Sequence, residues 1–294
     1  MLKVFTTFSG YDSQCIALDR IKHNYPFFDY DLVGWSEIEK SAIIAHDALF
    51  PQWKDRNFGD VCKIDWKNVD DFDLLTYSSP CQDFSKTGKW KGGKKGSNTK
   101  SSLLWMIEDA VIEKIPKYLV FENVANIVSK TFINTFNEWQ LTLEKLGYRN
   151  YAKILNAVDF GVPQSRNRIY LISIRNDING SYYFPQPSGE LTSVYDVLDD
   201  DVDDRYFLST EYKQKLFDRS DVDDYVLRRL TPVELFRLMG LNDSEIERMM
   251  MAKLPYYKVN RLSGNSIVVN VLEQIFIKLL INRKAMDYEQ LNLF

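Results

Sequence analysis

A cysteine and a glutamate follow two successive apolar segments of the chain. The segment at residues 72–77 predicts a short buried strand, and Cys81 comes after it behind Pro80. The segment at residues 118–121 predicts the next strand, and Glu122 comes directly after it. Because parallel strands end at one edge of a sheet, we expect both side chains near a ligand there. For the cysteine alone, a buried and inert thiol is the alternative.

Two arginines stand at the start of a later apolar segment. Arg166 and Arg168 lead into residues 168–174, which the sequence predicts to be a strand. Alternate residues of a strand point to the same side, so both guanidinium groups are expected on one face. A solvent-exposed pair on an antiparallel edge is the alternative interpretation.

Strands and helices alternate along the first part of the chain and would position these residues. The segment at residues 2–8 predicts a strand that ends in a turn containing Gly10, and a helix is expected from Gln14 to Ile21. This unit opens nucleotide-binding α/β folds, although an ordinary connecting loop has the same pattern. Further helices are expected after Ser101, at 131–146, after Thr231, near 244–251 and after Ser266, and further strands at 31–36 and 150–158.

Two acidic residues follow the predicted second strand. Glu37 stands at its tip, where such folds bind the two ribose hydroxyls. Asp60 lies in a turn before the third strand, where it could accept a hydrogen bond from an exocyclic amine. A helix-start glutamate and a capping aspartate are the simpler alternatives. These patterns together predict an α/β protein with a Rossmann-like doubly wound sheet.

A basic segment follows Cys81. Residues 86–100 contain six lysines, four glycines and one aromatic residue, Trp90, and no acidic residue. Such a segment is either a solvated flexible loop or a basic arm that closes on phosphates.

Composition sets the outer limits on function. The chain has 294 residues, 45% of them hydrophobic, and a net charge of −4, so nucleic-acid binding would need a local basic surface. No apolar run approaches the roughly 20 residues of a membrane span, and the chain enters a strand at Leu2, so we expect no signal peptide. Cys15, Cys62 and Cys81 lack paired spacing, so we expect no disulfide framework, no metal site and a cytoplasmic location.

The character of the chain changes after the paired arginines. Residues 190–224 contain twelve acidic and four basic residues, which predicts a polar connector with one or two short helices. We therefore predict a catalytic domain formed by residues 1–180 and 262–294, and a small second domain formed by residues 181–261.

The ordered motifs resemble those of the cytosine-5 DNA methyltransferases. The resemblance extends over roughly residues 2–280. The matching segments are Phe8-Ser9-Gly10, Pro80-Cys81-Gln82, Glu122-Asn123-Val124, Gln164-Ser165-Arg166-Asn167-Arg168, Arg229 to Gly240 and Gly264-Asn265-Ser266-Ile267.

The resemblance implies a reaction and a role for each candidate residue. Cys81 would attack carbon 6 of a flipped-out cytosine, which makes carbon 5 able to take a methyl group from S-adenosylmethionine. Glu122, as a carboxyl of raised pKa, would give a proton or a strong hydrogen bond to ring nitrogen 3. Arg168 with Arg166 would hold the base oxygen and nearby phosphates. The implied cofactor contacts are Phe8, Gly10, Tyr11, Asp12, Ser13, Glu37, Ile38, Asp60, Val61, Pro80, Leu103, Asn265 and Ile267. The implied contacts to double-stranded DNA are Gln82, Ser85, Lys86, Lys89 and Lys91.

The sequence departs from the family in two places. Tyr11-Asp12-Ser13 replaces a commoner glycine-rich version of the first motif. The interval from Ile169 to Arg229, where the family carries its target-recognition region, has only 61 residues (229 − 169 + 1). Three interpretations stay open: a DNA methyltransferase of a restriction–modification or phage system, the same chemistry on structured RNA such as tRNA, and a subunit that depends on a partner for recognition. The branch that acts on tRNA carries a further cysteine beside the Glu-Asn-Val motif, which is absent here.

Overall fold

The sheet has the order expected of a doubly wound fold. The computed structural model describes residues 1–79, 100–189, 192–217 and 227–282. In these residues six strands are arranged in the order β2-β1-β3-β4-β6-β5. β1 to β4 are parallel, and β6 runs antiparallel to both of its neighbours. The strands are β1 (Leu2–Thr7), β2 (Tyr30–Ser36), β3 (Leu74–Tyr77), β4 (Tyr118–Val124), β5 (Tyr148–Asn156) and β6 (Asn167–Arg175).

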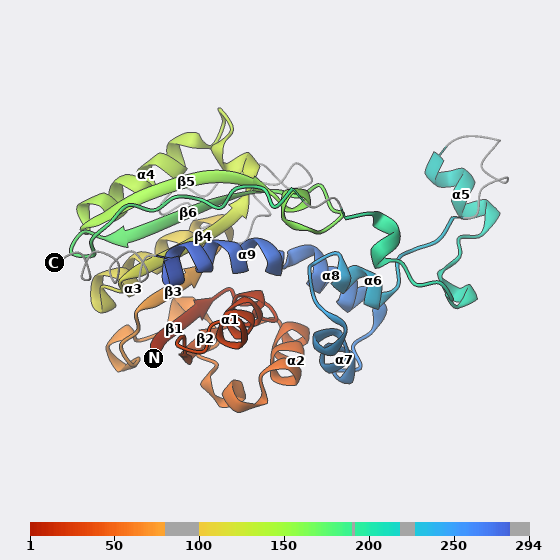
Figure 1. Ribbon diagram of the computed structural model, residues 1–294, viewed down its shortest axis with the longest axis horizontal. Coiled ribbons are helices and arrows are strands. Elements are labelled where there is room, and N and C mark those ends of the chain that lie inside the picture. The colour runs from red at the N-terminus through yellow and green to blue at the C-terminus, as the bar shows by residue number, and fades with distance from the viewer. Residues whose placement is uncertain (80–99, 190–191, 218–226, 283–294) are drawn as a thin grey trace.

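Helices cover both faces of the sheet, which confirms the predicted Rossmann-like α/β architecture (Figure 1). Side chains alternate along each strand, so Val120 packs into the core beneath α1 and α9, whereas Phe121 packs into the core beneath α3 and α4. The helices that build these layers are α1 (Ser13–Asn24), α2 (Lys40–Leu49), α3 (Met106–Lys114), α4 (Ile133–Lys145) and α9 (Val269–Phe276). Short 3₁₀ turns connect them at Pro51–Arg56, Val61–Lys63, Trp66–Asn68, Lys100–Trp105, Ala125–Val128 and Ala157–Phe160.

Two element boundaries differ from the sequence prediction. β4 continues beyond residue 121 to Val124, so Glu122 lies inside the strand. The reason is β6, whose residues Tyr170 and Arg168 pair with Glu122 and Val124 and extend the ladder. The helix expected after Ser101 begins as a 3₁₀ turn and becomes α-helical only at Met106.

Three helices near the end of the chain join the core beneath α1. They are α6 (Pro232–Arg237), α7 (Asp243–Met251) and α8 (Tyr256–Asn265). Phe236, Ile246 and Val259 are buried with residues of α1 and α9 in one hydrophobic cluster. Arg20 of α1 adds a polar link, because it donates to Glu245 and to the carbonyl of Gly240 at 2.6 Å. The expected boundary between residues 261 and 262 therefore falls within a helix, and that helix was not predicted.

The acidic connector forms an arm that extends away from the sheet and carries α5 (Thr210–Phe217) (Figure 1). Its other helical turns are Val194–Val197 and Asp204–Tyr206, so the prediction of short helices is confirmed. The base of the arm is closed by Glu234, which is inaccessible to solvent. Both terminal nitrogens of Arg228 donate to Glu234, and the N–H of Asp199 donates to it at 2.8 Å. The pKa of Glu234 is lowered by these hydrogen bonds, although burial opposes the shift.

The segment from Tyr256 to Ile281 is long and apolar enough to be compared with a membrane span, but 56% of its most apolar window is buried inside the protein. It consists of α8, α9 and a π-helical turn at Ile277–Ile281. Leu272 and Ile275 of α9 are completely buried in the cluster that also contains α1. This segment is accordingly a core element of the fold.

Candidate active site

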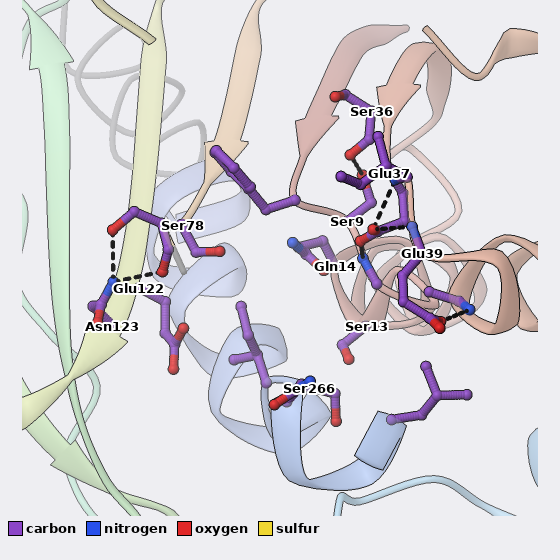
Figure 2. A pocket seen from close by; sticks show the side chains of 18 of the residues that line it. Ser9, Ser13, Gln14, Ser36, Glu37, Glu39, Ser78, Glu122, Asn123 and Ser266 are labelled. Carbon is purple, nitrogen blue, oxygen red and sulfur yellow. Dashed lines mark hydrogen bonds between the residues drawn. The ribbon is translucent and has the colours of Figure 1, made fainter. Parts of the chain in front are cut away.

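A cavity of about 290 Å³ lies at the carboxyl ends of β1 to β4. Its wall includes Phe8 after β1, Glu37 after β2, Ser78 after β3 and Glu122 of β4. β1 and β3 are neighbours whose following helices cover opposite faces, so the cavity lies at the switch point where open α/β sheets bind ligands. Figure 2 shows Glu37 and Gln14 on one side of the cavity and Glu122 with Asn123 on the other.

The turn after β1 brings backbone N–H groups to the cavity. Phe8, Gly10 and Asp12 all have positive φ angles, 52°, 59° and 67°, and this alternation folds the backbone tightly before α1. Ser13 and Gln14, the first residues of α1, line the cavity. The first N–H groups of a helix are unpaired within it and attract anions, so this end of the cavity fits a carboxylate.

Glu37 is held in a fixed orientation at the tip of β2. One carboxylate oxygen accepts from the N–H of Gly10 at 2.9 Å, and the other accepts from Ile38 and Glu39, both at 2.8 Å. The carboxylate faces the cavity between the turns that follow β1 and β2. A fixed acceptor at this position fits the vicinal hydroxyls of a ribose.

The far end of the cavity is formed by Asp60, Val61 and Leu103. Asp60 begins a 3₁₀ turn, and one of its carboxylate oxygens accepts from the N–H of Cys62 at 3.1 Å. Val61 is nearly buried, so a flat ring here would meet an apolar side chain and an acidic one. This combination fits an adenine with its exocyclic amine.

Tyr11 and Asp12, two of the implied cofactor contacts, do not line the cavity. The Tyr11 side chain is buried and donates its hydroxyl to Ser266 Oγ at 2.8 Å. The Asp12 side chain is also buried, and it caps α1 by accepting from the N–H of Cys15. The remaining predicted cofactor contacts outside residues 80–99 do line the cavity, namely Phe8, Gly10, Ser13, Glu37, Ile38, Asp60, Val61, Leu103, Asn265 and Ile267.

Asp12 has an unusual electrostatic environment for a capping residue. Burial raises its pKa to about 7, although hydrogen bonds from Thr6 and Cys15 oppose the shift. His46 Nε2 lies 3.8 Å from Asp12 Oδ2, and burial lowers the pKa of His46 to about 3, so this histidine is neutral at pH 7. The folded protein therefore holds a buried carboxyl that is half ionised near neutral pH.

Replacing Asp12 by asparagine is expected to change the pH dependence of stability. A folded pKa above the unfolded value means that the folded state binds more protons between pH 4 and 7, so wild-type stability falls as pH rises through this window. The free energy of unfolding of Asp12→Asn, relative to wild type, should increase by about 3 kcal/mol from pH 5 to pH 8. Urea unfolding of both proteins at these pH values measures the difference, in which the contribution of His46 cancels. If the difference in unfolding free energy between the two proteins does not vary with pH, the pKa of Asp12 is not raised in the folded protein.

Glu122 and Arg168 meet on the cavity side of the sheet. They occupy diagonal positions on neighbouring strands, and Arg168 Nε lies 3.1 Å from Glu122 Oε1. Burial raises the pKa of Glu122, whereas the positive charges of Arg168 and Arg166 oppose the shift. The site thus holds a carboxyl that stays protonated to a higher pH than an exposed glutamate does.

Arg166 lies close to Arg168 but makes different contacts. Its Nη2 donates to the backbone carbonyls of Gly264 at 2.9 Å and Ser266 at 2.6 Å. Both arginines line the cavity, as the alternation predicts, yet only Arg168 forms an ion pair with Glu122 among the described residues.

Asn123 connects the ends of β3 and β4. Its side-chain amide donates to the carbonyl and to Oγ of Ser79, both at 3.1 Å. Ser79 is the last described residue before the predicted nucleophile segment. Pro80, Cys81, the basic segment as far as residue 99 and the predicted DNA contacts Gln82, Ser85, Lys86, Lys89 and Lys91 lie outside the described residues.

Several cavity residues were missed by sequence reasoning. Ser9, Gln14, Ser79 and Arg261 all line the cavity. Gln14 was detectable in principle, because it follows the glycine turn directly and belongs to the first turn of α1. Arg261 precedes Gly264 by three residues, about one turn of α8, but its position depends on a helix that the sequence pattern did not reveal.

The fold and cavity define a Rossmann-like enzyme that binds a nucleotide-type cofactor beside a buried carboxyl. A sequence model of C-5 cytosine-specific DNA methylases matches residues 2–216 and 201–280. The chain therefore belongs to the C-5 cytosine-specific DNA methylase family, which confirms the resemblance. The cofactor of this family is S-adenosylmethionine, and the carboxylate, ribose and adenine positions described above fit it.

Individual relatives agree with this assignment. The chain is 34% identical to the type II methyltransferase M2.ScrFI of Lactococcus lactis subsp. cremoris, over 95% of this chain and 99% of that protein. It is 32% identical to the type II methyltransferase M.NgoBI of Neisseria gonorrhoeae, over 93% of this chain and 91% of the relative. Among solved structures, the Dnmt2 methyltransferase of S. pombe has a TM-score of 0.73 at 22% identity, over 96% of this chain and 99% of that one. At this identity, the structural likeness shows the fold alone.

Proposed function

We propose that this protein transfers a methyl group from S-adenosylmethionine to carbon 5 of cytosine in duplex DNA. The observation that carries the proposal is the common cavity of the Glu37 acceptor, the α1 N-terminus and the buried Glu122 carboxyl. A nucleotide-type cofactor and a proton donor for a base can thus be held in one cavity. The family assignment supplies the identity of both ligands.

The cofactor supplies an electrophilic methyl group on its sulfonium. This chain would hold the cofactor at three points. Glu37 would accept from the ribose hydroxyls, and Asp60 would accept from the adenine amine beside Val61. Backbone N–H groups at Ser13 and Gln14 would bind the methionine carboxylate.

The protein must make cytosine carbon 5 nucleophilic, because the aromatic ring is electron-poor. The Cys81 thiolate would form a bond to carbon 6, and negative charge would develop toward ring nitrogen 3. Glu122 would donate its proton, or a strong hydrogen bond, to this nitrogen, while Arg168 would hold the base oxygen. After methylation, loss of the carbon-5 proton restores the ring and expels the cysteine. A base can reach this cavity only if it is flipped out of the duplex.

The chain is shorter than its relative M2.ScrFI. The alignment with M2.ScrFI spans 365 positions, so at least 71 of them (365 − 294) have no residue of this chain. The short arm that carries α5 stands where a larger recognition region is expected. We infer that recognition uses few direct base contacts or that a second subunit contributes to it.

The cellular role follows from the relatives. They include bacterial type II methyltransferases and orphan methyltransferases of Bacillus phages. We infer that the protein acts in the bacterial cytoplasm, as part of a restriction–modification system or as a phage protein that modifies DNA. The same chemistry on tRNA is the alternative, since Dnmt2 shares the fold.

Conversion-based sequencing of DNA from bacteria that express the protein tests the proposal directly. We expect protected cytosines in a short recurring sequence, and none in cells that express Cys81→Ala. A parallel in vitro assay with labelled S-adenosylmethionine should offer duplex DNA and tRNA separately. Transfer to tRNA without transfer to DNA would favour the alternative substrate. Transfer to DNA only with a cell extract added would point to a partner.

A further inference from the structure

One wall of the cavity is formed by residues distant in sequence from the turn that follows β1. Gly264 and Asn265 end α8, and Ser266 and Ile267 lead into α9. All four line the cavity. Because the cofactor turn and this wall belong to opposite ends of the chain, their spacing depends on tertiary contacts.

Two side chains, the buried Tyr11 and the half-buried Arg166, fix this wall from different directions. The Tyr11 hydroxyl donates to Ser266 Oγ at 2.8 Å, and Ser266 Oγ in turn donates to the carbonyl of Ser263 at 3.0 Å. From the side of β6, Arg166 Nη2 donates to the carbonyls of Gly264 and Ser266. Only 1% of Tyr11 is exposed, so its hydrogen bond is shielded from water.

The backbone around each donor is itself anchored. The N–H of Arg166 donates to Asn156 Oδ1 at 2.8 Å, and its carbonyl accepts from Ala157. The Tyr11 ring packs edge-on against Phe236 of α6 with centroids 5.9 Å apart. The Tyr11 ring and the backbone of Arg166 are therefore held in place, and each donor reaches the wall from a fixed point.

We propose that Tyr11 and Arg166 are a pair of positioning residues that clamp the segment Gly264–Ser266 against the cofactor turn. This inference rests on the proposed cofactor. It differs from the implied role of Arg166 in holding the base or its phosphates. In the clamp, Arg166 holds the segment that forms the cofactor half of the cavity, whereas Arg168 contacts Glu122 in the base half. Tyr11 then has a function that the commoner glycine-rich version of this turn does not offer.

The test measures the affinity of the DNA-free protein for S-adenosylmethionine and S-adenosylhomocysteine by calorimetry. Tyr11→Phe removes one hydroxyl and no charge, and should raise the Kd about 3- to 10-fold, as expected for one buried hydrogen bond. Arg166→Met removes two charge-assisted bonds and should raise it at least about 10-fold. At saturating cofactor, kcat of Tyr11→Phe should return to within about 2-fold of wild type, while its KM for the cofactor stays high.

Two other arginine variants serve as controls for Arg166→Met. One controls for a general loss of stability, and the other controls for loss of contact with the base. Arg20→Met removes an arginine that also holds a late segment through a carbonyl, Gly240, but lines no part of the cavity. It should lower the melting temperature and leave the cofactor Kd unchanged. Arg168→Met should lower kcat and leave the Kd within about 3-fold.

Each result of these binding measurements leads to a different conclusion. If wild type binds neither compound, the proposed function fails. If wild type binds but Tyr11→Phe and Arg166→Met bind equally well, the clamp is refuted. If Arg166→Met keeps its cofactor affinity and loses affinity for DNA, Arg166 has the role that the family resemblance implied. A Kd that rises as much in Arg20→Met as in Arg166→Met would reduce the effect to a general loss of stability.

Discussion

Replacing Cys81 by alanine should reduce methyl transfer to the background of the assay. Without the thiolate, no bond forms at carbon 6, and carbon 5 of cytosine keeps its low nucleophilicity. Transfer of labelled methyl groups to duplex DNA measures the loss. Wild type should also form a stable covalent complex with DNA that contains 5-fluorocytosine. Fluorine replaces the carbon-5 hydrogen whose loss as a proton would expel the cysteine, so the cysteine stays bound. Cys81→Ala should form no such complex.

Cys62 provides a matched control for this prediction. It is an exposed thiol next to Val61 of the cavity wall, so Cys62→Ala makes the same chemical change near the same site. Its transfer rate should stay within about 2-fold of wild type, as for most surface substitutions away from the chemistry. Normal transfer by Cys81→Ala, or covalent trapping that depends on Cys62, would exclude the proposed nucleophile.

Glu122→Gln should lower kcat by about 10²- to 10⁴-fold, the usual contribution of a positioned acid or base. Glutamine preserves the shape of the side chain and can still contact Arg168, but it cannot give a proton to the base. Burial raises the pKa of Glu122, so its protonated form persists to higher pH than in an exposed glutamate. Wild-type kcat should fall as pH rises through this raised pKa, and the variant should lack that dependence.

Glu138→Gln is the control for this second prediction. Glu138 is exposed on α4, a helix of the opposite face of the sheet, so the same change of charge occurs far from the cavity. Its kcat and pH profile should match those of wild type. Unchanged kcat in Glu122→Gln with a raised KM for DNA would indicate that Glu122 only binds the substrate.

The order of strands and helices was predictable because hydrophobic periodicity reports which side of an element is buried. The segments at residues 2–8 and 118–121 predicted β1 and β4, and Thr231 as the cap with Pro232 in the first turn predicted the start of α6. The end of β4 was not predictable, because it depends on pairing with β6, nearly fifty residues later. α8 was missed because Pro255 stands at its N-cap position and no side chain caps its start, although Val259 and Leu262 are buried on one side of it.

The sequence predicted which residue types form the site, but it did not predict the direction of every side chain there. Glu37 follows β2 and Glu122 lies near the carboxyl end of β4, so topology brings these two positions together. The direction of a side chain within a turn could not be predicted in this way, because it depends on φ angles that the residue type does not reveal. Asp12 adopts a left-handed conformation that is uncommon outside glycine, and its side chain points away from the cavity.

The closed base of the arm affects how freely the arm can vary in length. Asp199 and Glu234 hold the two ends of the arm together through a network with Arg228 and Thr231. The entropy cost of lengthening a loop whose ends are already joined grows only slowly with its length. The length of the arm can therefore vary at a small entropic cost while the network that joins its ends is kept.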